Sequence, residues 1–409
     1  MTLSRRAWVT GLGALALGVG LGPLARAAFG KGDDLLVVVF LRGGCDGLNL
    51  VAPVSDPGYG PARGVPLRVG ESGARRGLAL ANGLAGTEFL LHARARELHG
   101  LYADGKLAIV HAVGLTHQTR SHFEAQALVE RGVADFGGVR DGWLKRLARE
   151  LGLARFGAIS ASGLEPESFL GLASALTVSQ PEDFQLSDDG GIEGLLERLL
   201  VGEGAIAAAG RETLAAVRQV RQHLARGSDG QVKAYKPSVP YPGETYDEFR
   251  GALLSIAELA KMQVGMRLAT VDLDGWDTHQ DQADRFSELV ARLSGQLAAF
   301  LEDLGSYPGR VTVLVMSEFG RRVKSNDSGG TDHGHGGSWL LLGNAVNGGR
   351  MYGRWPGLAT EQLDHGLDLA VTTDYRTVLA ELIGHLAGPE AVGRVLPGFE
   401  VPAPLGLLG

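Results

Sequence analysis

The stretch Asp34-Leu-Leu-Val-Val-Val-Phe-Leu41 is a continuous apolar run that leads directly into a glycine-rich segment beginning at Arg42. A run without polar alternation is typical of a strand buried on both faces of a parallel sheet. Similar strand-like runs occur at residues 107–113, 268–273, 311–316 and 339–342. Helical patterns lie near residues 122–131, 141–152, 192–225, 245–264, 283–304 and 374–387. This alternation predicts an α/β fold with a mostly parallel central sheet.

The composition of the 409-residue chain is that of a globular protein. Hydrophobic residues make up 44% and charged residues 21%, which excludes a disordered chain, a collagen and a coiled coil. The formal net charge of −7 argues against a nucleic-acid partner, because such proteins usually present a basic face. We expect one elaborated α/β domain over residues 28–409, with a helical insertion at about residues 185–265.

The N-terminal segment has the pattern of an export signal. Arg5 and Arg6 precede a moderately apolar stretch at residues 11–22, and Ala25-Arg26-Ala27 supplies a small-x-small cleavage site. This order predicts a twin-arginine signal peptide over residues 1–27, with the twin-arginine translocase as a partner and a periplasmic or secreted mature protein. A membrane anchor is the alternative, but about 12 apolar residues are fewer than the ~20 that a spanning helix needs. We expect no transmembrane span in the mature chain.

Two polar clusters follow the first two strand-like runs, where ligands bind in open α/β sheets. In the first, Asp46 is placed to hold a hard cation, although an Asp-Gly turn would also explain it. In the second, Ser121 is either the N-cap of a helix or a nucleophile assisted by Arg120. His117 and His122 in the same cluster are candidates for metal ligands or proton-transfer groups.

Two further clusters favour a metal site. Residues 272–279 hold three carboxylates and His279, which would repel one another without a cation or a basic partner. The segment 329–337 contains His333 and His335 among glycines, where neither packs a core nor caps a helix. Such histidines suit zinc, with Asp332 and other nearby carboxylates completing the ligand set.

The motifs together resemble those of an exported bacterial family catalogued as domain of unknown function 1501. The motifs are Arg-Gly-Gly-Cys-Asp-Gly-Leu-Asn (42–49), Thr-Arg-Ser-His-Phe (119–123), Asp-Gly-Trp-Asp-Thr-His (274–279), Ser-Glu-Phe-Gly-Arg (317–321) and Gly-Thr-Asp-His-Gly-His-Gly-Gly (330–337). That family is similar to a branch of the alkaline phosphatase and sulfatase superfamily. The resemblance implies a three-layer sandwich and metal-dependent hydrolysis of phosphate or sulfate esters through a hydroxyl or formylglycine nucleophile.

The resemblance also implies roles for individual residues. The metal-binding positions of the superfamily correspond to Asp46, to Asp274 or Asp277 with His279, to Glu318, and to His333 or His335. The nucleophile corresponds to Ser121 or Thr119, and Arg120 would neutralise charge that develops on the ester oxygens. Where the superfamily has an Asp-His pair, this chain has Glu318-Phe319, so one histidine is missing unless His122 or His117 replaces it. Cys45 lacks the context that formylglycine formation needs.

We therefore expect an exported hydrolase that acts on a small-molecule or envelope ester with one or two divalent cations. Zinc is the expected metal, and calcium and manganese are the alternatives. The runner-up is a non-catalytic exported metal-binding or envelope-scaffolding protein that keeps the fold, and a third reading is a metal-dependent enzyme that modifies carbohydrate or lipid.

Overall fold

The computed structural model describes residues 34–70, 73–84, 86–153, 156–163, 165–172, 175–178, 192–226, 228, 232–244 and 246–409. Residues 1–27, for which we expect the export signal, lie outside this range. No helix in the described part of the chain combines the length and the apolar character needed to cross a membrane.

The central sheet has the strand order β11-β5-β10-β9-β1-β8-β6-β7, and β12 pairs with β5 beside this path. Its strands are β1 (Leu35–Leu41), β5 (Leu107–Gly114), β6 (Ala158–Ser160), β7 (Leu176–Thr177), β8 (Leu268–Leu273), β9 (Val311–Met316), β10 (Gly337–Gly343), β11 (Arg350–Tyr352) and β12 (Thr373–Asp374). Within the described residues every pairing in this sheet is parallel except those of β10, which is antiparallel to both β5 and β9. The predicted α/β class and the mostly parallel sheet are confirmed.

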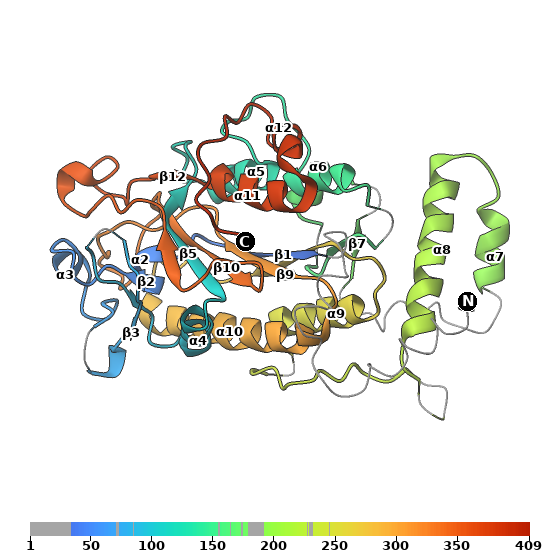
Figure 1. The fold of residues 1–409 in the computed structure, drawn as a ribbon, viewed down its shortest axis with the longest axis horizontal. Coiled ribbons are helices and arrows are strands. Elements are labelled where there is room, and N and C mark those ends of the chain that lie inside the picture. The colour runs from blue at the N-terminus through green and yellow to red at the C-terminus, as the bar shows by residue number, and fades with distance from the viewer. Residues whose placement is uncertain are drawn as a thin grey trace, which may run out of the picture.

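Helices cover both faces of this sheet (Figure 1). Successive side chains of β1 alternate between the faces, and all of them are buried, which explains the unbroken apolar run. One face carries α4 (Arg96–Ala103), α9 (Glu248–Lys261) and α10 (Gln282–Asp303). The other carries α5 (His122–Arg131), α6 (Trp143–Glu150), α11 (Tyr375–Ala387) and α12 (Val392–Val395).

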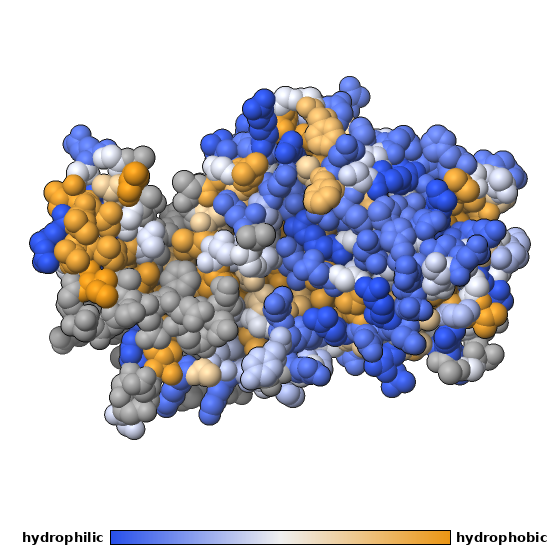
Figure 2. All heavy atoms as spheres, turned by 180° about the vertical axis from the view of Figure 1, so that it is seen from behind, coloured by the Kyte–Doolittle hydropathy of each residue, from blue (hydrophilic) through white to orange (hydrophobic). Residues whose placement is uncertain are grey.

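The expected insertion contains elements of two kinds. The pattern at residues 192–225 forms two helices, α7 (Ile192–Leu199) and α8 (Ala205–His223), because the intervening Val201-Gly-Glu-Gly204 breaks the helix. These helices lie beside the sheet in Figure 1, and their exposed apolar side chains form part of the hydrophobic surface at the left of Figure 2. By contrast α9, at the end of the same range, packs into the core.

A small accessory sheet follows β1. It has the order β2-β4-β3 and consists of β2 (Val51–Ala52), β3 (Leu78–Ala79) and β4 (Leu90–Leu91), all paired antiparallel. Two short helices, α2 (Gly47–Leu50) and α3 (Tyr59–Ala62), lie in the same part of the chain. Short 3-10 turns occur at Gly73–Arg75, Glu167–Phe169, Leu304–Ser306, Thr360–Gln362 and Pro389–Ala391. The two-residue strands explain why this region shows no periodicity in the sequence.

Candidate metal centre

The polar clusters meet at one edge of the central sheet because of its strand directions. Since β10 is antiparallel to both β5 and β9, β5 runs in the same direction as β9, β1 and β8. The segments that follow β1, β5, β8 and β9 therefore leave from one edge, and the segment that leads into β10 arrives there. This is the edge at which open α/β sheets bind ligands.

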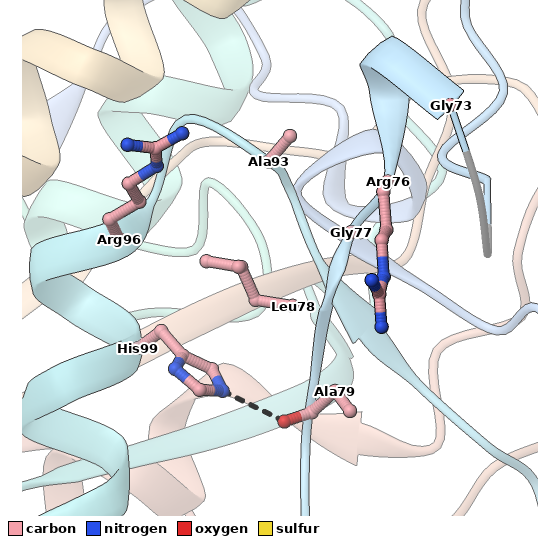
Figure 3. A pocket seen from close by; sticks show the side chains of 8 residues that line it. All are labelled: Gly73, Arg76, Gly77, Leu78, Ala79, Ala93, Arg96 and His99. Atoms are coloured by element: carbon pink, nitrogen blue, oxygen red, sulfur yellow. Dashed lines mark hydrogen bonds between the residues drawn. The ribbon is translucent and has the colours of Figure 1, made fainter.

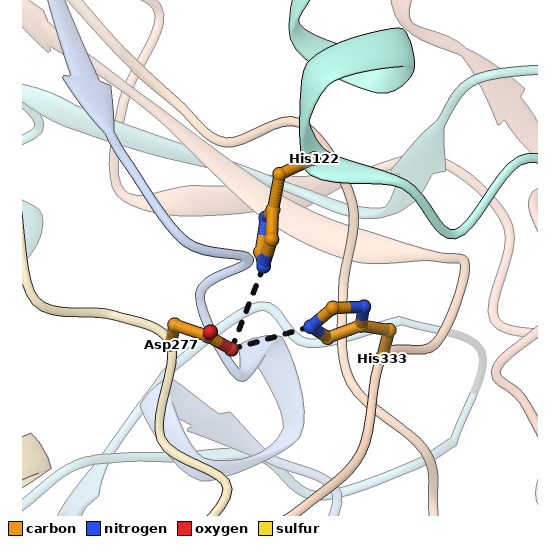
Figure 4. Close-up of side chains that lie close together, drawn as sticks. All are labelled: His122, Asp277 and His333. Atoms are coloured by element: carbon orange, nitrogen blue, oxygen red, sulfur yellow. Dashed lines mark hydrogen bonds and ion pairs between the residues drawn. The ribbon is translucent and has the colours of Figure 1, made fainter.

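Three side chains from three of these segments form the centre of the cluster: His122, Asp277 and His333 (Figure 4). Their potential ligand atoms all lie within 4.8 Å of one another. Asp277 Oδ1 is 3.5 Å from His122 Nε2 and 3.2 Å from His333 Nε2. His279 adds a fourth group, because its Nε2 lies 3.1 Å from Asp277 Oδ1 and 2.9 Å from His333 Nε2. Three imidazole Nε2 atoms thus converge on one carboxylate oxygen.

Each of the three imidazoles is held through its other nitrogen. His122 Nδ1 lies 2.8 Å from Glu318 Oε1, and His279 Nδ1 lies 3.2 Å from Asp332 Oδ1. His333 Nδ1 lies 2.8 Å from the main-chain oxygen of Arg120. All three partners are acceptors, so a proton on each Nδ1 would satisfy them and leave each Nε2 free to bind a cation at the centre. Outer acceptors of this kind orient metal-binding histidines in proteins.

The residues present fit a divalent cation. His122 Nε2 is buried and has no hydrogen-bond partner in the described structure, although it faces the cluster. The Nε2 atoms of His279 and His333 face each other, and two lone pairs at 2.9 Å repel unless a proton or a cation lies between them. Nitrogen and carboxylate ligands in this number suit zinc.

The protonation states of the cluster are set by its neighbours. The hydrogen bond to Glu318 raises the pKa of His122 despite its partial burial. Burial lowers the pKa of His333. Burial also acts to raise the pKa of Asp277, but the hydrogen bond and the charge of Arg321 outweigh it and bring this pKa to about 2. Asp277 is therefore an anion at neutral pH.

Arg321 connects the loops around the centre through hydrogen bonds. Its buried guanidinium donates to the main-chain oxygens of Gly43, Gly44, Thr331 and Trp276, and it lies 2.5 Å from Asp277 Oδ1. Gly43 has φ +115°, and a Cβ there would lie 2.4 Å from the main-chain nitrogen of Asp277, so this position needs glycine. The loop after β1 shapes the centre without supplying a ligand.

Asp46, which we expect to bind a metal, lies outside the cluster of His122, Asp277 and His333. Its carboxylate is fully buried in a salt bridge with Arg63, and it accepts a hydrogen bond from Gln282 Nε2 at 2.7 Å. It also caps α2 by accepting from the main-chain nitrogens of Leu48 and Asn49. With its charge neutralised and its oxygens occupied, Asp46 has a structural role.

His335 is also engaged elsewhere. Its Nδ1 lies 2.6 Å from Asp364 Oδ2 and its Nε2 lies 2.8 Å from the main-chain oxygen of Leu115. Both ring nitrogens of His335 are therefore occupied, and of the two histidines it is His333 that lies in the cluster. Asp274 lies outside this group, whereas Asp277 is at its centre. His117 Nδ1 accepts from the main-chain nitrogen of Thr119, whereas His122 reaches the centre.

The three expected catalytic residues have different surroundings. The Thr119 hydroxyl donates to Glu124 Oε2 at 2.6 Å. The Arg120 guanidinium is bound by Asp368 at 2.6 Å and by Asp364 at 3.3 Å, so only its main-chain oxygen reaches the cluster, through His333. Ser121 is exposed and precedes His122, and its hydroxyl does not cap α5.

Sequence reasoning missed two contributors to the centre. Arg321 and Phe319 both lie in the quoted motif 317–321, but an arginine that binds main-chain oxygens leaves no pattern in a sequence. The Phe319 ring lies 4.9 Å from the rings of both His122 and His333. It forms an apolar wall behind the two imidazoles.

No curated protein matches the chain. A family model described as "Protein of unknown function (DUF1501)" matches residues 244–396, a range that contains Asp277, His279, Glu318 and His333 but not His122. Over the segment that carries most of the candidate metal centre, the chain is therefore similar to the family DUF1501.

Proposed function

We propose that this protein is an exported metal-dependent hydrolase of phosphate or sulfate esters, with a single divalent cation held by His122, Asp277, His333 and His279. One observation carries the proposal: three histidines direct Nε2 at one carboxylate oxygen while their Nδ1 atoms are held by acceptors. Zinc is the proposed metal, because imidazole and carboxylate ligands at a four-group site suit it better than calcium or manganese.

The centre is open on one side, as a catalytic site requires. The side chains of Asp277 and His279 are 48% and 39% exposed, whereas Glu318 behind them is fully buried. A structural metal site is normally closed by protein ligands, while a catalytic one leaves a position for water or substrate. A divalent cation here would polarise an ester oxygen and lower the pKa of an attacking water molecule.

The surroundings favour water over a side-chain hydroxyl as the nucleophile. Thr119 donates its hydroxyl proton to Glu124, and Arg120 directs its guanidinium at Asp364 and Asp368. In the proposed reaction the water oxygen forms the new bond to phosphorus or sulfur, and the alcohol oxygen leaves and takes up a proton. The exposed Ser121 is the one candidate hydroxyl left to test as an alternative.

The metal content of the purified protein tests the first part of the proposal. Elemental mass spectrometry should find about one equivalent of zinc, and a His122→Ala/His333→Ala variant should lose it. A matched His223→Ala variant, altered at an exposed histidine on α8, should keep it. Less than about a tenth of an equivalent after incubation with zinc, manganese or calcium would overturn the metal centre.

Turnover of model esters tests the second part. Nitrophenyl phosphate, its diester and nitrophenyl sulfate should be hydrolysed by the metal-loaded protein, with loss of activity in the double variant and little change in a Ser121→Ala variant. A loaded centre without turnover of any ester would favour the metal-binding or scaffolding alternative. Export is tested separately by whether the periplasmic protein begins near Ala28.

A further inference from the structure

Two adjoining pockets lie in the accessory region, away from the residues of the candidate metal centre. The first, which we call the His99 pocket, has a volume of about 470 Å³ and is lined by residues that include Arg76, Arg96 and His99 (Figure 3). The second, the His92 pocket, has a volume of about 180 Å³, and its lining includes Arg75, Arg94 and His92. Both contain Ala93 in their lining, so they are neighbours.

Four of the arginines that line the pockets come in pairs from two short segments of the chain. Arg75 and Arg76 are adjacent at the end of a short 3-10 turn, and each lines a different pocket. Arg94 and Arg96 lie on the segment that opens α4, and they are divided between the pockets in the same way. Figure 3 shows Arg76 and Arg96 coming from opposite walls of the His99 pocket. The His99 pocket is thus lined by two arginines and the His92 pocket by three, because Arg68 also lines the latter while donating to the main-chain oxygens of Gly60 and Arg63.

The positive charge of the pockets is not matched by acidic side chains. Among the described residues, neither pocket has an aspartate or glutamate in its lining. Arg75 donates to the main-chain oxygen of Val65 at 2.8 Å and has no carboxylate partner within the described part of the chain. Glu97, next to Arg96, accepts instead from the Ser294 hydroxyl at 2.8 Å. This local excess of positive charge contrasts with the formal net charge of the chain, which is −7.

His92 lines the same pocket as two of these arginines, Arg75 and Arg94. It is buried against Phe286, and its Nδ1 accepts from the main-chain nitrogen of Arg94. Burial and then the charges of Arg94 and Arg75 lower the pKa of His92 to about 4. Both guanidinium groups therefore raise the electrostatic potential at the base of the pocket, where His92 is neutral at pH 7. A positive potential in a concave, partly desolvated site attracts anions.

We propose that the His92 and His99 pockets together form a binding site for a multivalent anion, one that carries two or more phosphate or sulfate groups. Guanidinium groups bind such groups through paired, charge-assisted hydrogen bonds. Two pockets side by side suit a ligand with its charges spaced along a chain better than a single monovalent ion. The ligand is either a soluble oligophosphate or the headgroup of an anionic lipid. This proposal does not depend on the metal centre.

Calorimetric titration of the full chain with inorganic tripolyphosphate tests the site. Because tripolyphosphate also binds metals, the titration is repeated on the His122→Ala/His333→Ala variant, where binding should persist. Arg75→Gln/Arg94→Gln should weaken binding at least tenfold, and so should Arg76→Gln/Arg96→Gln. A charge-matched Arg149→Gln control, altered on α6, should change it less than twofold. Thermal unfolding of each variant checks that it is folded.

Vesicles identify the source of the anion. Co-sedimentation with cardiolipin vesicles, whose headgroup carries two phosphates, but not with phosphatidylcholine vesicles, lost in the double arginine variants, would support a lipid headgroup. Binding of tripolyphosphate without co-sedimentation would support a soluble ligand. Absence of binding to both probes at low ionic strength would overturn the proposal. Binding that the folded arginine variants retain would also overturn it.

Discussion

Replacing Glu318 with glutamine separates the role of its charge from its role in packing. The carboxylate is fully buried, and Oε1 accepts from His122 Nδ1 at 2.8 Å, from Gln126 Nε2 at 2.8 Å and from the main-chain nitrogen of Gly43 at 2.9 Å. Glutamine has nearly the same shape, so the packing survives. The substitution removes the negative charge that holds the proton on His122 Nδ1 and directs Nε2 at the centre.

The expected loss follows from this geometry. A hydrogen bond to a charged group contributes about 1.5–3 kcal/mol. A tenfold change in affinity corresponds to about 1.4 kcal/mol, so full loss of the charged contribution weakens metal binding roughly 10- to 100-fold. This is also the range found when outer acceptors of metal-binding histidines are removed. We therefore expect the dissociation constant for zinc to rise by one to two orders of magnitude in Glu318→Gln.

Competition with a fluorescent zinc chelator measures this change. Glu130→Gln is the matched control, because Glu130 is a buried carboxylate that pairs with Arg42 at 3.1 Å and has no contact with the three histidines. The control should keep the zinc affinity of the unaltered protein even where it loses stability. Equal affinity in Glu318→Gln and the unaltered protein, or an equal loss in Glu130→Gln, would refute the assigned role of Glu318.

Three further outcomes are expected. Asp368→Asn should weaken zinc binding about 3- to 10-fold in the same competition assay, because it frees the Arg120 guanidinium and loosens the main-chain oxygen that holds His333. Arg321→Met should lower the free energy of unfolding in urea by about 3–5 kcal/mol, since it leaves buried main-chain oxygens and Asp277 without their donor. Zinc affinity should fall as the pH drops through the raised pKa of His122, because protons then compete with zinc for Nε2. In the metal-free protein, protonated His122 should stabilise the fold at low pH, and this stabilisation should be lost as the pH rises through the same pKa. Unfolding curves between pH 5 and 9 would check the second effect.

The strands of the central sheet could be predicted because burial leaves a direct trace in the sequence. The strand-like runs at residues 268–273 and 311–316 coincide with β8 and β9, whose side chains are almost all buried. The helix at residues 122–131 likewise matches α5. By contrast, the pattern at 192–225 spans two helices, because its apolar period continues across the glycines that end α7. The spacing of apolar residues indicates which side chains face a core. The end of a helix or strand depends instead on local residues such as glycine that favour other backbone conformations.

The sequence predicts where in the fold the candidate centre lies, but it does not predict which side chains form it. Strand ends of a parallel sheet share one edge, so the polar segments after them were expected to meet. Which side chain turns inward depends on partners far away in the chain. Asp46 follows a strand among glycines, as a metal ligand could, but Arg63 neutralises the charge of its carboxylate. No pattern in the sequence predicts that these two residues form a pair. His335 has the same setting as His333, but Asp364 binds it.

Phe319 stands at the position where the resemblance to the alkaline phosphatase and sulfatase superfamily implies a histidine. The Phe319 ring packs against His122 and His333, so it occupies the space behind the imidazoles and supplies no ligand atom. His122 enters from the first residue of α5 and is fixed by Glu318, which lies 196 residues later in the chain. In the proposed centre Glu318 would act through the imidazole of His122 and not as a direct ligand. The strand order brings the segments after β5 and β9 to one edge, so His122 could supply the nitrogen ligand that the motif 317–321 lacks.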